Sequence, residues 1–174
     1  MFGFRKQLVT QFNLIIRFFL NHHASRASSI LQKNSKLYGP KNALDYENTS
    51  TSWNSEGSSS DKTSQLTSYV VEFGRLVQPL EFKIQFQAGF AAEQTHIFVL
   101  DSDETWKPIV ELDTEDDHKI QEFSLLPDVS NELVTTKALK VVFDECTDFY
   151  NRIIVYQLQV LGYEANNSGL SISK

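Results

Sequence analysis

The sequence is short of cysteine, and this limits both its covalent chemistry and its compartment. Cys146 is the single cysteine among 174 residues, so an intramolecular disulfide is excluded. Small secreted β-domains often carry such a bridge, and its absence favours the cytosol or the nucleus. Because acidic residues surround Cys146 in the sequence, we expect a raised thiol pKa and a packed, unreactive side chain rather than a nucleophile.

Acidic residues are missing from one end of the chain. Residues 1–44 carry seven of the 16 basic residues and no Asp or Glu, so the remaining nine basic and 22 acidic residues give a net charge of −13. A body this acidic repels phosphate backbones, and we therefore expect no direct binding to nucleic acid by that part.

Long apolar runs are also missing. The run Leu14–Leu20 is interrupted by Arg17 and is too short to span a bilayer, and no Ala-x-Ala site follows it. The amphipathic, acid-free start resembles a mitochondrial presequence, with a weakly structured extension as the alternative. We expect residues 1–22 to lie outside the fold, 23–164 to form one domain, and 165–174 to be a flexible tail.

The sequence contains none of the common catalytic signatures. It has no G-x-S-x-G, no P-loop and no glycine-rich dinucleotide loop, and its four histidines are scattered. The acidic stretch 113–117 has no regular ligand spacing and is expected to be a solvated turn. We therefore expect no enzymatic activity.

What the sequence does contain is a two-residue alternation of apolar and polar side chains, typical of strands with one buried face. It is clearest over Leu80–Phe86, where every second residue is polar. Gly74 and Pro79 are interpreted as turn residues, Pro108 as an edge or bulge position, and Ser55–Ser68 as a long loop. The expected strands are Ser28–Leu31, Tyr69–Phe73, Leu80–Phe86, Thr95–Leu100, Trp106–Leu112, Lys119–Leu125, Ala138–Phe143 and Arg152–Leu161. About eight short strands predict an all-β jelly-roll sandwich.

Several separated motifs resemble the discoidin, or galactose-binding-like, family. They are the runs Ala43–Trp53, Val70–Gly74, Val99–Trp106 and Ile153–Gly162. The runs Ser25–Ser29, Ser52–Ser55, Gln85–Phe90 and Thr147–Arg152 resemble one branch, the nuclear-receptor-associated proteins.

This resemblance implies a nuclear protein that acts by interaction, with a nuclear receptor as protein partner and corepression of receptor-dependent transcription. We expect a monomeric, non-enzymatic domain in the nucleus and cytoplasm, without membrane contact. The alternatives are a discoidin domain that binds carbohydrate or lipid, and a scaffold subunit of an intracellular complex.

Four residues are candidates for partner binding. Phe90 follows Gly89 where a strand gives way to a loop, and Asp148, Tyr150 and Arg152 crowd the connection before the last strand. The alternatives are that Phe90 folds back over the sheet edge and that Asp148 and Arg152 form a local ion pair. Trp53 is expected to pack at the base of the core.

The resemblance also raises the question of a structural Ca²⁺. Asp45, Asn48 and Thr51 are weak candidates for loop ligands, but Gln157 stands where the family would supply a glutamate. We therefore expect neither a metal nor a cofactor.

Overall fold

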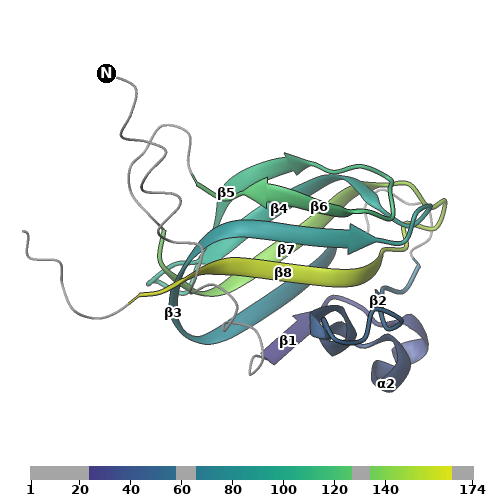
Figure 1. Cartoon of the computed structure of the whole chain (residues 1–174), viewed down its shortest axis with the longest axis horizontal. Helices are drawn as coiled ribbons and strands as arrows, with labels where there is room; N and C mark the ends of the chain where they lie inside the picture. Colours follow the sequence, from purple (N-terminus) through teal and green to yellow (C-terminus); the bar gives the residue numbers. More distant parts are fainter. Residues whose placement is uncertain (1–23, 58–65, 127–133, 166–174) are drawn as a thin grey trace, which may run out of the picture.

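The structure is a computed structural model that describes residues 24–57, 66–126 and 134–165 (Figure 1). The predictions for residues 1–22 and for nearly all of the tail lie outside this part. Ala165, the first residue of the expected tail, is described, and its N–H donates to the carbonyl oxygen of Leu76 at 3.0 Å. In chain order the elements are β1 (Ala24–Ala27), η2 (Leu31–Lys33), α2 (Ser35–Tyr38), η3 (Pro40–Leu44), β2 (Trp53–Asn54), β3 (Thr67–Phe86), β4 (Ala92–Leu100), β5 (Trp106–Asp113), β6 (Ile120–Ser124), β7 (Thr136–Cys146) and β8 (Ile154–Glu164).

The long strand β3 is the centre of the sheet and pairs directly with four other strands. Its first half pairs with β1 and β7, and its second half pairs with β8 and β6. The register shifts between Glu72 and Val77, around Gly74, whose φ of +65° is open to glycine without strain. Figure 1 shows β3 curving from one layer into the other at this bend. All strand pairings are antiparallel. The eight strands are hydrogen-bonded into one sheet, and this sheet folds into a sandwich because β3 contributes to both layers.

The core lies between the two layers and takes alternate residues from both halves of β3. Tyr69, Val71 and Phe73 come from the first half, and Phe82, Ile84 and Phe86 from the second. Leu139, Val141 and Phe143 of β7 meet Val155, Leu158 and Val160 of β8 in the same cluster. The alternation of apolar and polar residues therefore arises as predicted, because each layer buries only one of its two faces.

The predicted all-β sandwich of eight strands is confirmed, with local corrections, one of which is the two-residue strand β2 (Trp53–Asn54) that was not predicted from the sequence. The first strand is Ala24–Ala27 rather than Ser28–Leu31, because Leu31 begins a 3₁₀ turn instead. The expected strands Tyr69–Phe73 and Leu80–Phe86 are two parts of β3, since Gly74 bends the strand without ending it. Pro79 lies inside β3 at a register shift, where a residue without an N–H is tolerated in a ladder. The last strand starts at Ile154, two residues later than expected, because Arg152 belongs to the preceding loop.

The interpretation of Pro108 is confirmed. Strand β5 lies at the end of the strand order, and the β4–β5 register shifts where Phe98 pairs with Pro108. None of the helical segments in the described ranges has the length and hydropathy needed to cross a membrane.

Trp53 occupies the predicted place at the base of the core. It is fully buried, and its ring packs against Tyr69 and Phe143 at centroid distances of 5.2 and 5.8 Å. Its indole N–H donates to the carbonyl oxygen of Ser29 at 3.1 Å, so the segment between β1 and β2 is tied to the sandwich through this side chain.

Candidate functional site

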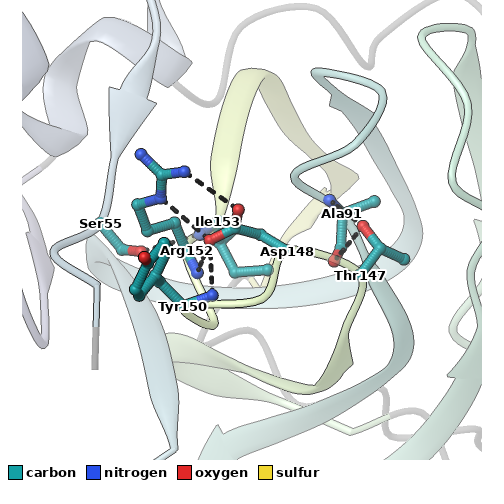
Figure 2. A network of polar contacts seen from close by, with 7 residues as sticks. All are labelled: Ser55, Ala91, Thr147, Asp148, Tyr150, Arg152 and Ile153. Atoms are coloured by element: carbon teal, nitrogen blue, oxygen red, sulfur yellow. Dashed lines mark hydrogen bonds and ion pairs between the residues drawn. The ribbon is translucent and has the colours of Figure 1, made fainter. Parts of the chain in front are cut away.

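Two connections meet at the end of the sandwich away from the β3 bend. One joins β3 to β4, and the other joins β7 to β8. The N–H of Thr147 donates to the carbonyl oxygen of Ala91 at 2.9 Å, and the N–H of Ala91 donates to the Thr147 hydroxyl at 3.2 Å (Figure 2). The N–H of Ile154 donates to the carbonyl oxygen of Phe90 at 3.0 Å. These bonds fix the two loops side by side.

Asp148 organises the β7–β8 loop. Its Oδ2 accepts from the N–H of Tyr150 at 3.1 Å and from the N–H of Arg152 at 3.2 Å. Its two oxygens also take the Nε and a terminal nitrogen of the Arg152 guanidinium, at 2.9 and 3.0 Å (Figure 2). The guanidinium and the backbone N–H groups hold the pKa of the Asp148 carboxyl below its usual range. The loop is therefore built around an ionised carboxylate.

The guanidinium of Arg152 is held on its other sides by aromatic rings. Its central carbon lies 4.8 Å from the centroid of the Phe90 ring and 5.7 Å from that of Tyr150. The bidentate ion pair and the two cation–π contacts leave Arg152 little rotamer freedom. Asp148 has a side chain only 10% exposed, so the predicted ion pair is more sheltered than an ordinary surface pair.

Two aromatic side chains project from this rigid loop into solvent. Phe149 is 78% exposed and Tyr150 is 56% exposed, and their rings meet edge to face at 5.2 Å. We call Phe90, Phe149, Tyr150 and Arg152 the aromatic platform. Single exposed apolar side chains are common on protein surfaces, but a cluster of them on one loop is a feature of binding surfaces.

A third segment, residues 55–57 after β2, packs against the platform and the start of the last strand. After β2, the hydroxyl oxygen of Ser55 accepts from the N–H of Ile153 at 2.8 Å (Figure 2). Gly57 then passes close to the platform, where an added Cβ would lie 3.2 Å from the Cβ of Tyr150 and 3.3 Å from the Cγ of Arg152. A Cβ at this point would make contacts tighter than most, and the side chains of Tyr150 and Arg152 would have to shift by a few tenths of an ångström to admit it.

The structure brings together all four residues predicted from the sequence for partner binding: Phe90, Asp148, Tyr150 and Arg152. The alternative of a local Asp148–Arg152 ion pair is also present in the structure. Phe90 is half-buried and its ring covers the Arg152 guanidinium, so it is not a fully exposed loop-tip residue. Sequence reasoning missed Phe149, Ser55 and Gly57. An apolar side chain between Asp148 and Tyr150 in a polar loop was a usable signal for Phe149. No local sequence pattern indicated that Ser55 and Gly57 contact the β7–β8 loop, because they lie far from that loop in the sequence.

The weak Ca²⁺ candidates do not form a cation site. Asn48 uses its side-chain oxygen to accept from the backbone and hydroxyl of Ser50, at 3.2 and 2.6 Å. The Thr51 hydroxyl donates to the carbonyl oxygen of Asn48 at 3.0 Å. Across the described residues, no three His, Cys, Asp or Glu side chains gather as metal ligands would. These oxygens stabilise the turn, and the residues present do not fit Ca²⁺.

Cys146 is a half-buried thiol at the end of β7. Burial, with smaller contributions from Asp144 and Asp148, raises the pKa of this thiol to about 11. The expected raised pKa is confirmed, although burial rather than the neighbouring charges is its main cause.

The fold is that of the galactose-binding-like class. Among solved structures, the chain is similar to the C-terminal domain of a Bacteroides fragilis chitobiase, with a TM-score of 0.68 and 12% identity over 85% of this chain and 98% of that one. It is also similar to a family 32 carbohydrate-binding module of Clostridium perfringens NanJ in complex with galactose, with a TM-score of 0.63 and 13% identity over 80% and 93%. At these identities the likeness shows the fold alone.

Sequence relatives are more specific. The chain is 33% identical over 141 residues to nuclear receptor 2C2-associated protein of Mus musculus, covering 81% of this chain and 91% of the relative. It is 34% identical over 142 residues to the protein of the same name from Danio rerio, covering 82% and 92%. No model of a known protein family matches the sequence. The chain belongs to the family of nuclear receptor 2C2-associated proteins.

Proposed function

We propose that this chain is a non-enzymatic module that binds another protein through the aromatic platform. The observation that carries the proposal is the exposure of Phe149 and Tyr150, 78% and 56%, on a loop immobilised by Asp148 and Arg152. Exposed rings on a rigid loop bury a large apolar area on binding and lose little conformational entropy when they do so.

The platform has the composition of a binding hot spot. Aromatic residues and Arg dominate the energy of protein interfaces, and a few such residues near the centre of a contact carry most of it. Here three rings and one guanidinium lie within one patch. The ion pair to Asp148 orients Arg152 before any partner arrives, so its ordering cost is already met in the unbound state.

The names of the relatives support a choice of partner class. Their name associates them with nuclear receptor 2C2, and the chain covers about nine-tenths of their length. We propose a nuclear receptor of this kind as the partner, with corepression of receptor-dependent transcription as the consequence of binding.

The test is direct binding between the purified full chain and purified nuclear receptor 2C2. We expect Phe149→Ala and Tyr150→Ala each to weaken binding at least tenfold, because truncated hot-spot rings typically cost about 2 kcal/mol or more. The matched control is Leu126→Ala, a comparably exposed apolar residue that follows β6 and lies outside the platform. Equal binding by all three variants would exclude the platform as the contact surface.

Carbohydrate binding is a second candidate function. It is favoured by the exposed ring pair beside a guanidinium, since sugars stack on aromatic faces, and by a fold neighbour solved in complex with galactose. A glycan array probed with the full chain separates the two functions. Specific glycan signals that disappear in Phe149→Ala would support this second candidate, and an array without signals would remove it.

We also propose that the protein works in the nucleus and cytoplasm, as its single cysteine and its relatives suggest. A fluorescent fusion of the full chain, compared with one that lacks residues 1–22, tests this location. Mitochondrial fluorescence that depends on residues 1–22 would contradict it and support the presequence alternative.

A further inference from the structure

We infer that the protein segment accepted by the aromatic platform is apolar and flanked by Lys or Arg. This inference rests on the proposed function, since it names the chemistry of the ligand for the same surface.

The first support is the set of carboxylates around the platform. Glu56 precedes Gly57, which packs against Tyr150 and Arg152. Asp116 reaches the β3–β4 loop, where its Oδ1 accepts from the N–H of Gly89 at 2.6 Å, one residue before Phe90. Glu145 lies at the end of β7, just before the platform loop. All three residues are exposed. Oε2 of Glu56 accepts from the N–H of Gln32 at 2.8 Å, and like the Asp116 contact this bond to a backbone N–H does not neutralise the carboxylate.

The second support is the ion pairing of the basic side chains near the platform. The charge of Arg152 is already matched by Asp148, and Lys119 is paired with Asp117 at 2.9 Å. Within the described ranges, no ion pair joins Glu56, Asp116 or Glu145 to a cation of the chain itself. The platform is therefore an apolar centre with a negative rim, and charge complementarity selects a positive flank on the partner.

The third support is the place of the chain ends. Ala24 pairs with Glu72 and Glu164 pairs with Val77, so both ends of the described domain enter and leave near the β3 bend. The platform lies at the opposite end, beyond Phe86 of β3 and before Ile154 of β8. The whole chain has a formal net charge of −6, which adds a long-range attraction for a basic ligand.

The experiment uses the full chain and two labelled peptides as probes. Both peptides carry the same Leu and Phe positions, but one is flanked by Lys and the other by Glu. Fluorescence anisotropy gives the affinity, and amide chemical shifts of Phe149 and Tyr150 give the place of binding. We expect the Lys peptide to bind about tenfold more tightly at low salt, and the difference to shrink in about 1 M salt as the charges are screened.

The variants separate the rim from the rings. The triple variant Glu56→Gln, Asp116→Asn, Glu145→Gln removes the rim charges but keeps an oxygen acceptor for the N–H of Gly89. We expect it to weaken the Lys peptide about tenfold and to leave the Glu peptide no weaker than before. The control variant Asp103→Asn, Glu104→Gln, Glu111→Gln also removes three exposed charges, from the β4–β5 hairpin, and should leave both affinities unchanged.

The outcomes distinguish the inference from the proposed function. If Phe149→Ala abolishes binding of both peptides and the rim variant changes neither, the platform stands and the basic preference is overturned. If the control variant weakens the Lys peptide as much as the rim variant does, attraction is to the acidic body in general and the inference is again wrong. If neither peptide shifts the Phe149 and Tyr150 amides, the inference is overturned, and the receptor experiment decides the platform independently.

Discussion

The molecule contains two aromatic clusters with nearly the same local geometry and opposite surroundings. In the core, the rings of Trp53 and Tyr69 meet edge to face at 5.2 Å. In the platform, the rings of Phe149 and Tyr150 also meet edge to face at 5.2 Å. Trp53 and Tyr69 are fully buried, whereas Phe149 and Tyr150 are 78% and 56% exposed.

The difference shows that ring contacts alone do not tell whether a cluster stabilises the fold or binds a partner. In the core, every polar atom of the pair is matched, with the Trp53 indole on the Ser29 carbonyl at 3.1 Å and the Tyr69 hydroxyl on the Pro40 carbonyl at 2.6 Å. Burial also raises the pKa of Tyr69. In the platform, polar contacts fix the loop backbone and Arg152 and leave the rings in water. Rings in the core stabilise the fold because they are buried away from water. Under the proposed function, the rings of the platform would gain the same stabilisation only when a partner covers them.

The largest effect should come from truncating the core cluster. Trp53→Ala removes a fully buried ring between Tyr69 and Phe143, and we expect it to lower the free energy of unfolding by about 3–5 kcal/mol. Urea denaturation followed by circular dichroism measures the change. Trp53→Phe keeps most of the ring volume and should cost less. A loss below about 1 kcal/mol for the alanine variant would mean that Trp53 is not central to the core.

Truncating the platform should have the reverse pattern. Phe149→Ala removes a ring that is 78% exposed, so we expect a stability change within about 0.5 kcal/mol but a loss of receptor binding of tenfold or more. Denaturation and binding are measured on the same preparation. If Phe149→Ala lowered the free energy of unfolding as much as Trp53→Ala does, the platform would be part of what stabilises the fold, and the two clusters would not differ in role.

Loosening the loop under the platform should have an intermediate effect. Asp148→Asn keeps the shape of the side chain but removes the charge that holds Arg152 and two backbone N–H groups. We expect a loss of about 1 kcal/mol in stability and weaker binding, because Arg152 is no longer oriented. Denaturation tests this, with Asp113→Asn, exposed on β5, as the control that should change neither property.

The smallest effect should appear on acidification. The pKa of Asp148 is lowered in the folded state, so its contribution to stability is complete above its ordinary value of 3.8 and is lost as the pH falls below it. The NMR signal of the Arg152 side-chain Nε–H should persist from pH 6 down to the ordinary carboxyl value of 3.8, because the folded-state pKa of Asp148 lies lower, and it should weaken only as the pH falls further. In Asp148→Asn the signal should be weak at both pH values. A wild-type signal that is already lost at pH values above 3.8 would show that the ion pair does not order Arg152.

Much of the fold could be predicted from the sequence, because burial on one face of a strand imposes a two-residue period. The alternation over Leu80–Phe86 and the position of Pro108 were reliable guides. The sequence did not show that β3 is one strand, because a glycine inside a bent strand and a glycine in a turn leave the same local pattern. Ser28–Leu31 was misplaced for a similar reason, since a four-residue edge strand carries too few residues for a period to show.

For the site, the sequence by itself determined which side chains the β7–β8 loop presents, including the Asp148–Arg152 pair, since residues four apart in a tight loop are neighbours. Only the tertiary structure decided that Phe90 closes over Arg152 and that Ser55 and Gly57 support the loop from below. Those contacts join segments that are 98 residues apart in the case of Ser55 and Ile153. Such distant partners meet because the two layers pack face to face around one core, and packing of this kind leaves no mark on the local pattern of either segment.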